Sequence, residues 1–232
     1  MSPAKPEGFP LKSRDNKAMD EKEFKHTLNN LWRSRRLIDL AKETEIPEQT
    51  QNDLLGAAIV FLHATLEEFL QVVAIGEWLK LNDEDLKNVL RKYSRLNTRN
   101  IKINLVDSVE RRNATIKTFI KEEIKSFVYQ DMNFNSFKEV KDFLNLKIIT
   151  FNENLQAKLK LEEKDFTNIE LLLRKRHGVA HQAGCSNLDL EQVLVWAKSL
   201  QHFLFNLAQS LGLEMKYREE LKQIVFAATK SS

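Results

Sequence analysis

The stretch LLGAAIVFLHATLEEFLQVVAIGEWL, residues 54–79, decides the fold class of this chain. It contains no proline and is apolar nearly all round a helix, which is typical of a helix packed on every side by others. Its length invites a membrane-spanning interpretation, but His63, Glu67 and Glu68 lie at its middle, where each charge would cost roughly 2.5–3.5 kcal/mol in a bilayer. We therefore predict a central helix over about 52–81 in a soluble core.

The rest of the chain also predicts helices. Three of the four prolines lie in the first ten residues, and none follows Pro47. Residues 97–107 alternate in a way that fits either a strand or an irregular link. The spacing of apolar side chains predicts long helices over about 20–43, 108–129, 165–182, 190–211 and 215–228, and short ones over 83–93, 133–150 and 152–161. The predicted fold is an all-α, up-and-down helical bundle with short helical insertions.

Local signals refine these boundaries. Asp189 and Gln192 have the spacing of a capping box, with Asp189 as the N-cap of the 190–211 helix. Gly184 and Gly212 are natural stops for the helices that precede them. The first helix has an apolar stripe that includes Trp32. We predict a flexible tail over residues 1–17 and a single domain over residues 18–228.

Composition limits the class of protein. The 232 residues are 42% hydrophobic and 30% charged, which fits a globular chain. A single cysteine, Cys185, excludes an internal disulfide, and no apolar signal segment is found near the N-terminus, so we expect a cytoplasmic protein with no membrane partner. The net charge of +3 says little. Basic clusters at 33–36, 111–112 and 174–176 suit a polyanion, but such runs are usually solvated faces.

The chemistry is concentrated in LLLRKRHGVAHQ, residues 171–182. In metal-free RNA cleavage, a base takes the proton of the attacking 2′-hydroxyl and an acid protonates the departing 5′-oxygen. Histidine titrates near neutrality and can do either. Arginine offers a fixed cationic fork for the charged phosphate oxygens. Two histidines and two arginines near one helix end therefore indicate phosphodiester chemistry.

Two segments carry a family resemblance. Arg176 to His181, RHGVAH, resembles the signature of the HEPN superfamily, which is an arginine, four to six residues and a histidine. Residues 57–70, AAIVFLHATLEEFL, resemble the long second helix of the RiboL-PSP-type HEPN branch, and Glu67 falls where that branch commonly has an acidic residue. The four-helix core of such proteins would correspond to residues 20–81 and 108–213.

The resemblance implies a bundle of HEPN type and a metal-independent endoribonuclease that leaves a 2′,3′-cyclic phosphate and needs no cofactor. Such proteins work as homodimers, with the two motifs facing each other across a cleft. A two-fold dimer also agrees with the chemistry, because one His181 supplies only one acid or base. Many members are toxins or antiphage effectors, so RNA and an antitoxin or other regulatory protein are the expected partners. The alternatives are a non-catalytic HEPN-like module that binds RNA or protein, and a plain helical interaction protein.

Within the motif we assign catalysis to Arg176 and His181, and RNA binding or orientation to His177, Arg174 and Glu67. Arg174 is the alternative motif arginine, because residues seven apart lie about 20° from one another on a helix and residues five apart about 140°. Arg174 could equally pair with Glu170 in a salt bridge.

Three further alternatives concern the neighbouring residues. Glu67 is expected either to hold the motif arginine or to contact His63 locally. His177 and His181 have the spacing of a zinc pair, but no third ligand has a clear spacing, so no metal is expected. Gly178 indicates either a close approach of RNA or of a partner chain, or ordinary packing.

Overall fold

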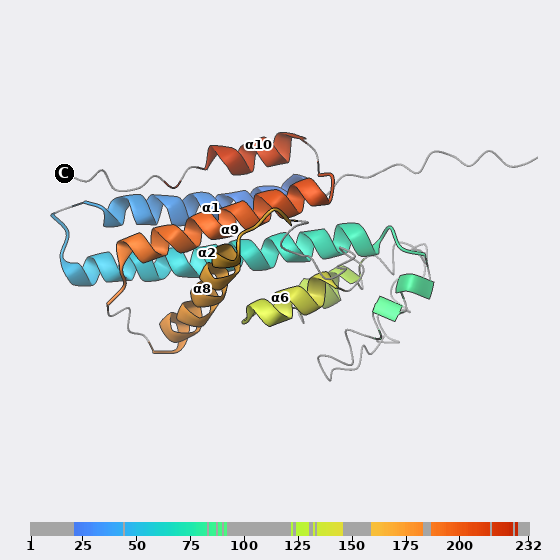
Figure 1. The fold of residues 1–232 in the computed structure, drawn as a ribbon, viewed down its shortest axis with the longest axis horizontal. Coiled ribbons are helices and arrows are strands. Elements are labelled where there is room, and N and C mark those ends of the chain that lie inside the picture. Colours follow the sequence, from blue (N-terminus) through green and yellow to red (C-terminus); the bar gives the residue numbers. More distant parts are fainter. Residues whose placement is uncertain are drawn as a thin grey trace, which may run out of the picture.

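A computed structural model describes residues 21–43, 45–82, 84–86, 88–89, 91, 122, 124–129, 132, 134–145, 159–182, 187–213, 215–224 and 226. No strand occurs within these ranges, so the all-α prediction is confirmed. The tail predicted over 1–17, the ambiguous link over 97–107 and the Gly184 loop lie outside them. The helices with labels in Figure 1 are α1 (Glu21–Ala41), α2 (Glu48–Trp78), α6 (Phe137–Leu144), α8 (Glu163–Gln182), α9 (Leu190–Ser210) and α10 (Met215–Gln223).

Helix α2 is the centre of the bundle. It contacts α1, α8 and α9, and the three long helices α1, α2 and α9 run side by side while α8 crosses them obliquely (Figure 1). Side chains on different sides of α2 are fully buried, among them Leu62, Leu70 and Trp78. The sequence predicted this position, because a helix that is apolar all round has no solvent face to offer.

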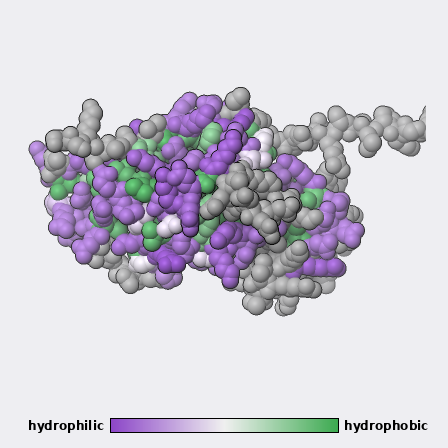
Figure 2. All heavy atoms as spheres, viewed as in Figure 1, coloured by the Kyte–Doolittle hydropathy of each residue, from purple (hydrophilic) through white to green (hydrophobic). Residues whose placement is uncertain are grey.

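Helix α2 also has the length and composition of a membrane span. Of its most apolar window, 72% is buried inside the fold, which is the arrangement of a core helix. Hydrophilic side chains cover most of the coloured part of the face in Figure 2, and apolar ones are scattered between them.

The turn between α1 and α2 is fixed at the start of α2 by a proline and at the end of α1 by a side-chain hydrogen bond. Pro47 precedes α2 with φ −58°, where its missing N–H costs no helical hydrogen bond. The Gln51 side chain then donates from Nε2 to the Ala41 carbonyl oxygen at 2.7 Å, which satisfies an acceptor at the end of α1. These two features hold α1 antiparallel to α2.

Several local predictions need correction. Trp32 is 41% exposed, and the Arg35 guanidinium lies 5.1 Å from the centre of its ring, so Trp32 belongs to the surface and not to the core stripe. Asp189 does cap α9, but its carboxylate accepts from the Glu191 N–H at 3.0 Å and not from Gln192. The last helix is also shorter than predicted and ends at Gln223.

Candidate active site

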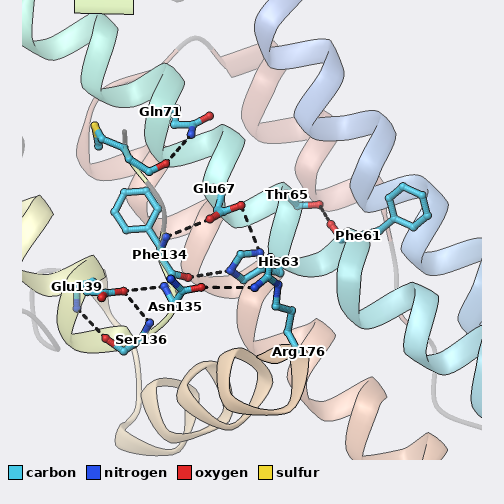
Figure 3. A network of polar contacts seen from close by, with 11 residues as sticks. Phe61, His63, Thr65, Glu67, Gln71, Phe134, Asn135, Ser136, Glu139 and Arg176 are labelled. Carbon is cyan, nitrogen blue, oxygen red and sulfur yellow. Dashed lines mark hydrogen bonds and ion pairs between the residues drawn. The ribbon is translucent and has the colours of Figure 1, made fainter. Parts of the chain in front are cut away.

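Three polar side chains interrupt the apolar surface of α2 at intervals of four residues. His63, Glu67 and Gln71 therefore share one face of the helix. All three bond to the main chain of a segment that precedes α6 (Figure 3). His63 Nε2 donates to the Phe134 carbonyl at 2.8 Å, the Phe134 N–H donates to Glu67 Oε1 at 3.1 Å, and Gln71 Nε2 donates to the Met132 carbonyl at 3.0 Å.

The main-chain groups that these bonds satisfy belong to Met132 and Phe134, which lie outside the helices. His63, Glu67 and Gln71 thus hold the main chain of Phe134 and Met132 against α2. The Phe134 ring is 2% exposed and packs edge-on against Phe143 of α6, with the ring centres 5.1 Å apart. We call Met132, Phe134, Asn135 and Ser136, together with these three α2 side chains, the clamp.

The histidine of the clamp is almost fully buried. Its Nδ1 lies 3.4 Å from Glu67 Oε2, and its exposed fraction is 2%. Burial lowers the pKa of His63 below its ordinary value, and the positive charge of Arg176 lowers it further. The Glu67 carboxylate and the hydrogen bond to Phe134 act in the opposite direction but do not reverse the shift. Neutral imidazole is therefore favoured near pH 7.

Helix α8 brings Arg176 to the clamp. Arg176 lies seven residues after the buried Ile169, about 20° away on the helix, so it continues the inward face of α8. Its Nη1 donates to Asn135 Oδ1 at 3.5 Å, and Figure 3 shows its guanidinium beside His63. The side chain is half-buried. The site thus brings together residues of α2, of α8 and of the segment that precedes α6.

Arg174 faces elsewhere. Its Nε donates to Glu170 Oε1 at 2.9 Å, and 72% of its side chain is exposed. The predicted salt bridge with Glu170 is therefore confirmed. The other oxygen of Glu170 accepts from the Phe137 N–H at 2.7 Å, at the start of α6.

The histidines of the motif lie beyond Arg176. His177 is exposed on α8, and His181 lies in the last turn of the helix, where the structure describes the main chain. A Cβ built on Gly178, between them, would have no described atom within 4 Å. The packing explanation for this glycine therefore has no support within the described part of one chain.

Glu67 does not hold Arg176. Its two oxygens face the Phe134 N–H and His63, which is the local alternative considered from the sequence. Asn135 takes the place expected for Glu67 as the acceptor for Arg176, and sequence reasoning missed it. A signal was present, because Ser136 and Glu139 form a capping box that places the N-cap of α6 directly after Asn135.

The fold and the site together define a helical bundle with a basic, histidine-containing helix end next to a buried polar network. Residues 28–212 match the family model described as RiboL-PSP-HEPN, and the chain belongs to this family. Membership confirms the resemblance and points to an RNase-like or RNA-binding function. Searches of curated proteins and of solved structures find no match to the chain.

Proposed function

We propose that the protein is a metal-independent endoribonuclease whose active site contains Arg176 and His181. One observation supports it above the others: within a HEPN family match, the Arg176 guanidinium is oriented by Asn135 and not neutralised by a carboxylate among the described residues. A cation that is held in place and keeps its charge is suited to a phosphodiester.

The reaction needs two proton transfers. A base removes the proton of the ribose 2′-hydroxyl, the 2′-oxygen bonds to phosphorus, and the bond from phosphorus to the 5′-oxygen breaks. An acid then protonates the 5′-oxygen, which leaves a 2′,3′-cyclic phosphate. His181 supplies one of these transfers, and Arg176 stabilises the charge that develops on the phosphate oxygens. Arg174 and His177, on the exposed side of α8, bind the RNA on either side of the cleaved bond, and Glu67 supports the site through the clamp.

A second copy of the chain completes the site in this proposal. One His181 can act as acid or as base at one time, so a two-fold homodimer with the two α8 ends facing each other supplies both. A cytoplasmic toxin or antiphage effector, held in check by an antitoxin or regulatory protein, fits such an enzyme. Expression of the wild type beside His181→Ala tests this setting, because only the wild type is expected to arrest growth.

The direct test is cleavage of single-stranded RNA by the purified protein in EDTA. His181→Ala is expected to lower kcat by about 10²- to 10⁴-fold, the usual contribution of a general acid or base. His26→Ala, an exposed histidine on α1, is the matched control and should leave cleavage unchanged. RNA binding without cleavage by the wild type would favour a non-catalytic binding module. Equal cleavage by wild type and His181→Ala would remove His181 from the mechanism.

A further inference from the structure

Asn135 is held on both sides by different helices. On one side, His63 and Glu67 of α2 bind the carbonyl and the N–H of Phe134. On the other, the Phe137 N–H donates to Glu170 of α8 at 2.7 Å. The Asn135 N–H itself donates to Glu139 Oε2 at 2.7 Å, next to the capping box of α6. These hydrogen bonds fix the main chain of Asn135 independently of any contact that its side chain makes.

The side-chain amide of Asn135 then meets the motif arginine. Its Oδ1 accepts from Arg176 Nη1 at 3.5 Å, across the space between the clamp and α8 (Figure 3). An amide oxygen is a neutral acceptor, so it can set the direction of a guanidinium without cancelling its charge. The carboxylate of Glu67 would cancel that charge, but its Oε1 accepts from the Phe134 N–H instead.

We propose that Asn135, presented by the clamp, is a positioning residue that aims the Arg176 guanidinium at an RNA phosphate. The proposal rests on the proposed function for the identity of the ligand, but it concerns a residue outside the Arg176–His181 motif. It assigns the segment that precedes α6 a part in the site, in addition to its part in packing.

Two substitutions separate orientation from charge. Asn135→Ala removes the acceptor and lets the guanidinium move, so kcat should fall about 3- to 10-fold, the equivalent of one hydrogen bond, with KM nearly unchanged. Asn135→Asp keeps an acceptor but pairs with Arg176, so RNA binding should weaken about 10-fold and KM should rise. Asn145→Ala, the same change at the exposed C-terminal end of α6, is the matched control and should alter neither.

The closing experiment is a double-mutant cycle with Arg176, read by two methods. In the first, affinity for a single-stranded 2′-O-methyl RNA, which cannot be cleaved, is measured at several salt concentrations. Asn135→Asp should weaken binding and lower the salt slope by about 0.7, one phosphate contact, and it should do neither in an Arg176→Ala background. In the second, Asn135→Ala should slow cleavage in the wild type but not in Arg176→Lys.

The two readings distinguish this inference from the proposed function. Loss of coupling in the binding cycle, with the Asn135 variants acting equally with and without Arg176, would overturn the role of Asn135 even if the wild type cuts RNA. A binding cycle as expected in a protein that never cuts RNA would support the role of Asn135 and overturn the nuclease assignment.

Discussion

Arg174 and Arg176 lie two positions apart on α8 and bond to different parts of the fold. Arg174 Nε is 2.9 Å from Glu170 Oε1 on its own helix, whereas Arg176 Nη1 is 3.5 Å from Asn135 Oδ1, 41 positions earlier in the chain. Residues two apart on a helix point about 160° from one another, which explains the difference. His181 follows Arg174 by seven residues, so the two positions lie on the same side of α8. Arg176 lies on the other side and faces the clamp.

This difference predicts unequal effects of two otherwise identical substitutions. Arg176→Ala should lower kcat for RNA by about 10²-fold or more, as expected for a lost transition-state donor. Arg174→Ala should lower kcat less than about 10-fold and change the free energy of unfolding by at most about 0.5 kcal/mol, because its salt bridge is largely exposed. Steady-state kinetics and urea unfolding measure both effects. The reverse order of the two kcat values would identify Arg174 as the motif arginine.

Gly178 offers a test for an external partner at α8. Neither Gly178 nor Gly76 of α2 would place a Cβ within 4 Å of a described atom. Replacement by alanine should therefore raise the free energy of unfolding by about 0.5–1 kcal/mol at each position, because glycine is a poor helix former. In the proposed function, RNA or a second chain approaches α8 at Gly178, so only Gly178→Ala should weaken RNA cleavage or dimer formation.

Gly76→Ala is the matched control for that experiment. If both variants are stabilised and both keep full activity and the oligomeric state of the wild type, no close approach occurs at Gly178. Light scattering and the cleavage assay together supply the comparison.

The buried histidine predicts a dependence of stability on pH. The pKa of His63 is lowered in the folded protein, chiefly by burial, whereas an unfolded histidine titrates near about 6.5. The unfolded state then binds the proton more readily, so the stabilisation is present above about pH 6.5 and is lost as pH falls through the lower folded pKa. The free energy of unfolding should therefore decrease as the pH is lowered from about 7.5 to about 5.5.

His63→Gln isolates this contribution, because glutamine can still donate to the Phe134 carbonyl but does not titrate. The variant should lose less stability than the wild type over the same pH range, in matched urea titrations. His26→Gln, at an exposed position, should follow the wild type. Parallel curves for the wild type and His63→Gln would show that His63 does not carry the pH dependence.

Adjacent glutamates on α2 should respond in opposite directions. Burial raises the pKa of Glu68, and its Oε2 is buried with no hydrogen-bond partner among the described residues. Glu68→Gln should therefore raise stability at pH 7, by up to about 0.5 kcal/mol after screening by solvent. This gain should shrink as pH falls toward the unfolded pKa, where the wild-type carboxyl becomes protonated as well.

Glu67→Ala should instead destabilise the fold by about 1–3 kcal/mol, because it leaves the Phe134 N–H without its acceptor. Thermal or urea unfolding of the two variants side by side checks the contrast. An equal loss of stability in both would mean that the clamp contributes nothing beyond the helix surface.

The sequence predicted the main elements well for a physical reason. The apolar surface of α2 and the helical spacing in α1, α8 and α9 are local patterns, and burial of such a surface requires other helices. The motif from Arg176 to His181 is local as well, and so is the polar stripe through His63 and Glu67. The family match over residues 28–212 confirms the resemblance to the RiboL-PSP-type HEPN branch.

Contacts between segments that are distant in the chain could not be predicted from these local patterns. Trp32 has the spacing of a core residue but is 41% exposed, because α2 covers a different part of α1. Glu67 was expected at the motif arginine but bonds to the Phe134 main chain instead. The local sequence around Met132 and Phe134 does not predict their contacts with α2. These hydrogen bonds depend on the path of the chain between the helices.

The amino-acid order alone thus determined that this protein is a helical bundle of the HEPN type with a cationic, histidine-bearing end on one helix. Only the packing of α2, α8 and the clamp decided that Arg176 faces inward to Asn135 while Arg174 remains at the surface with Glu170. The reason is geometric: helix periodicity tells which residues share a side, but which side meets a neighbour is decided when separate helices pack.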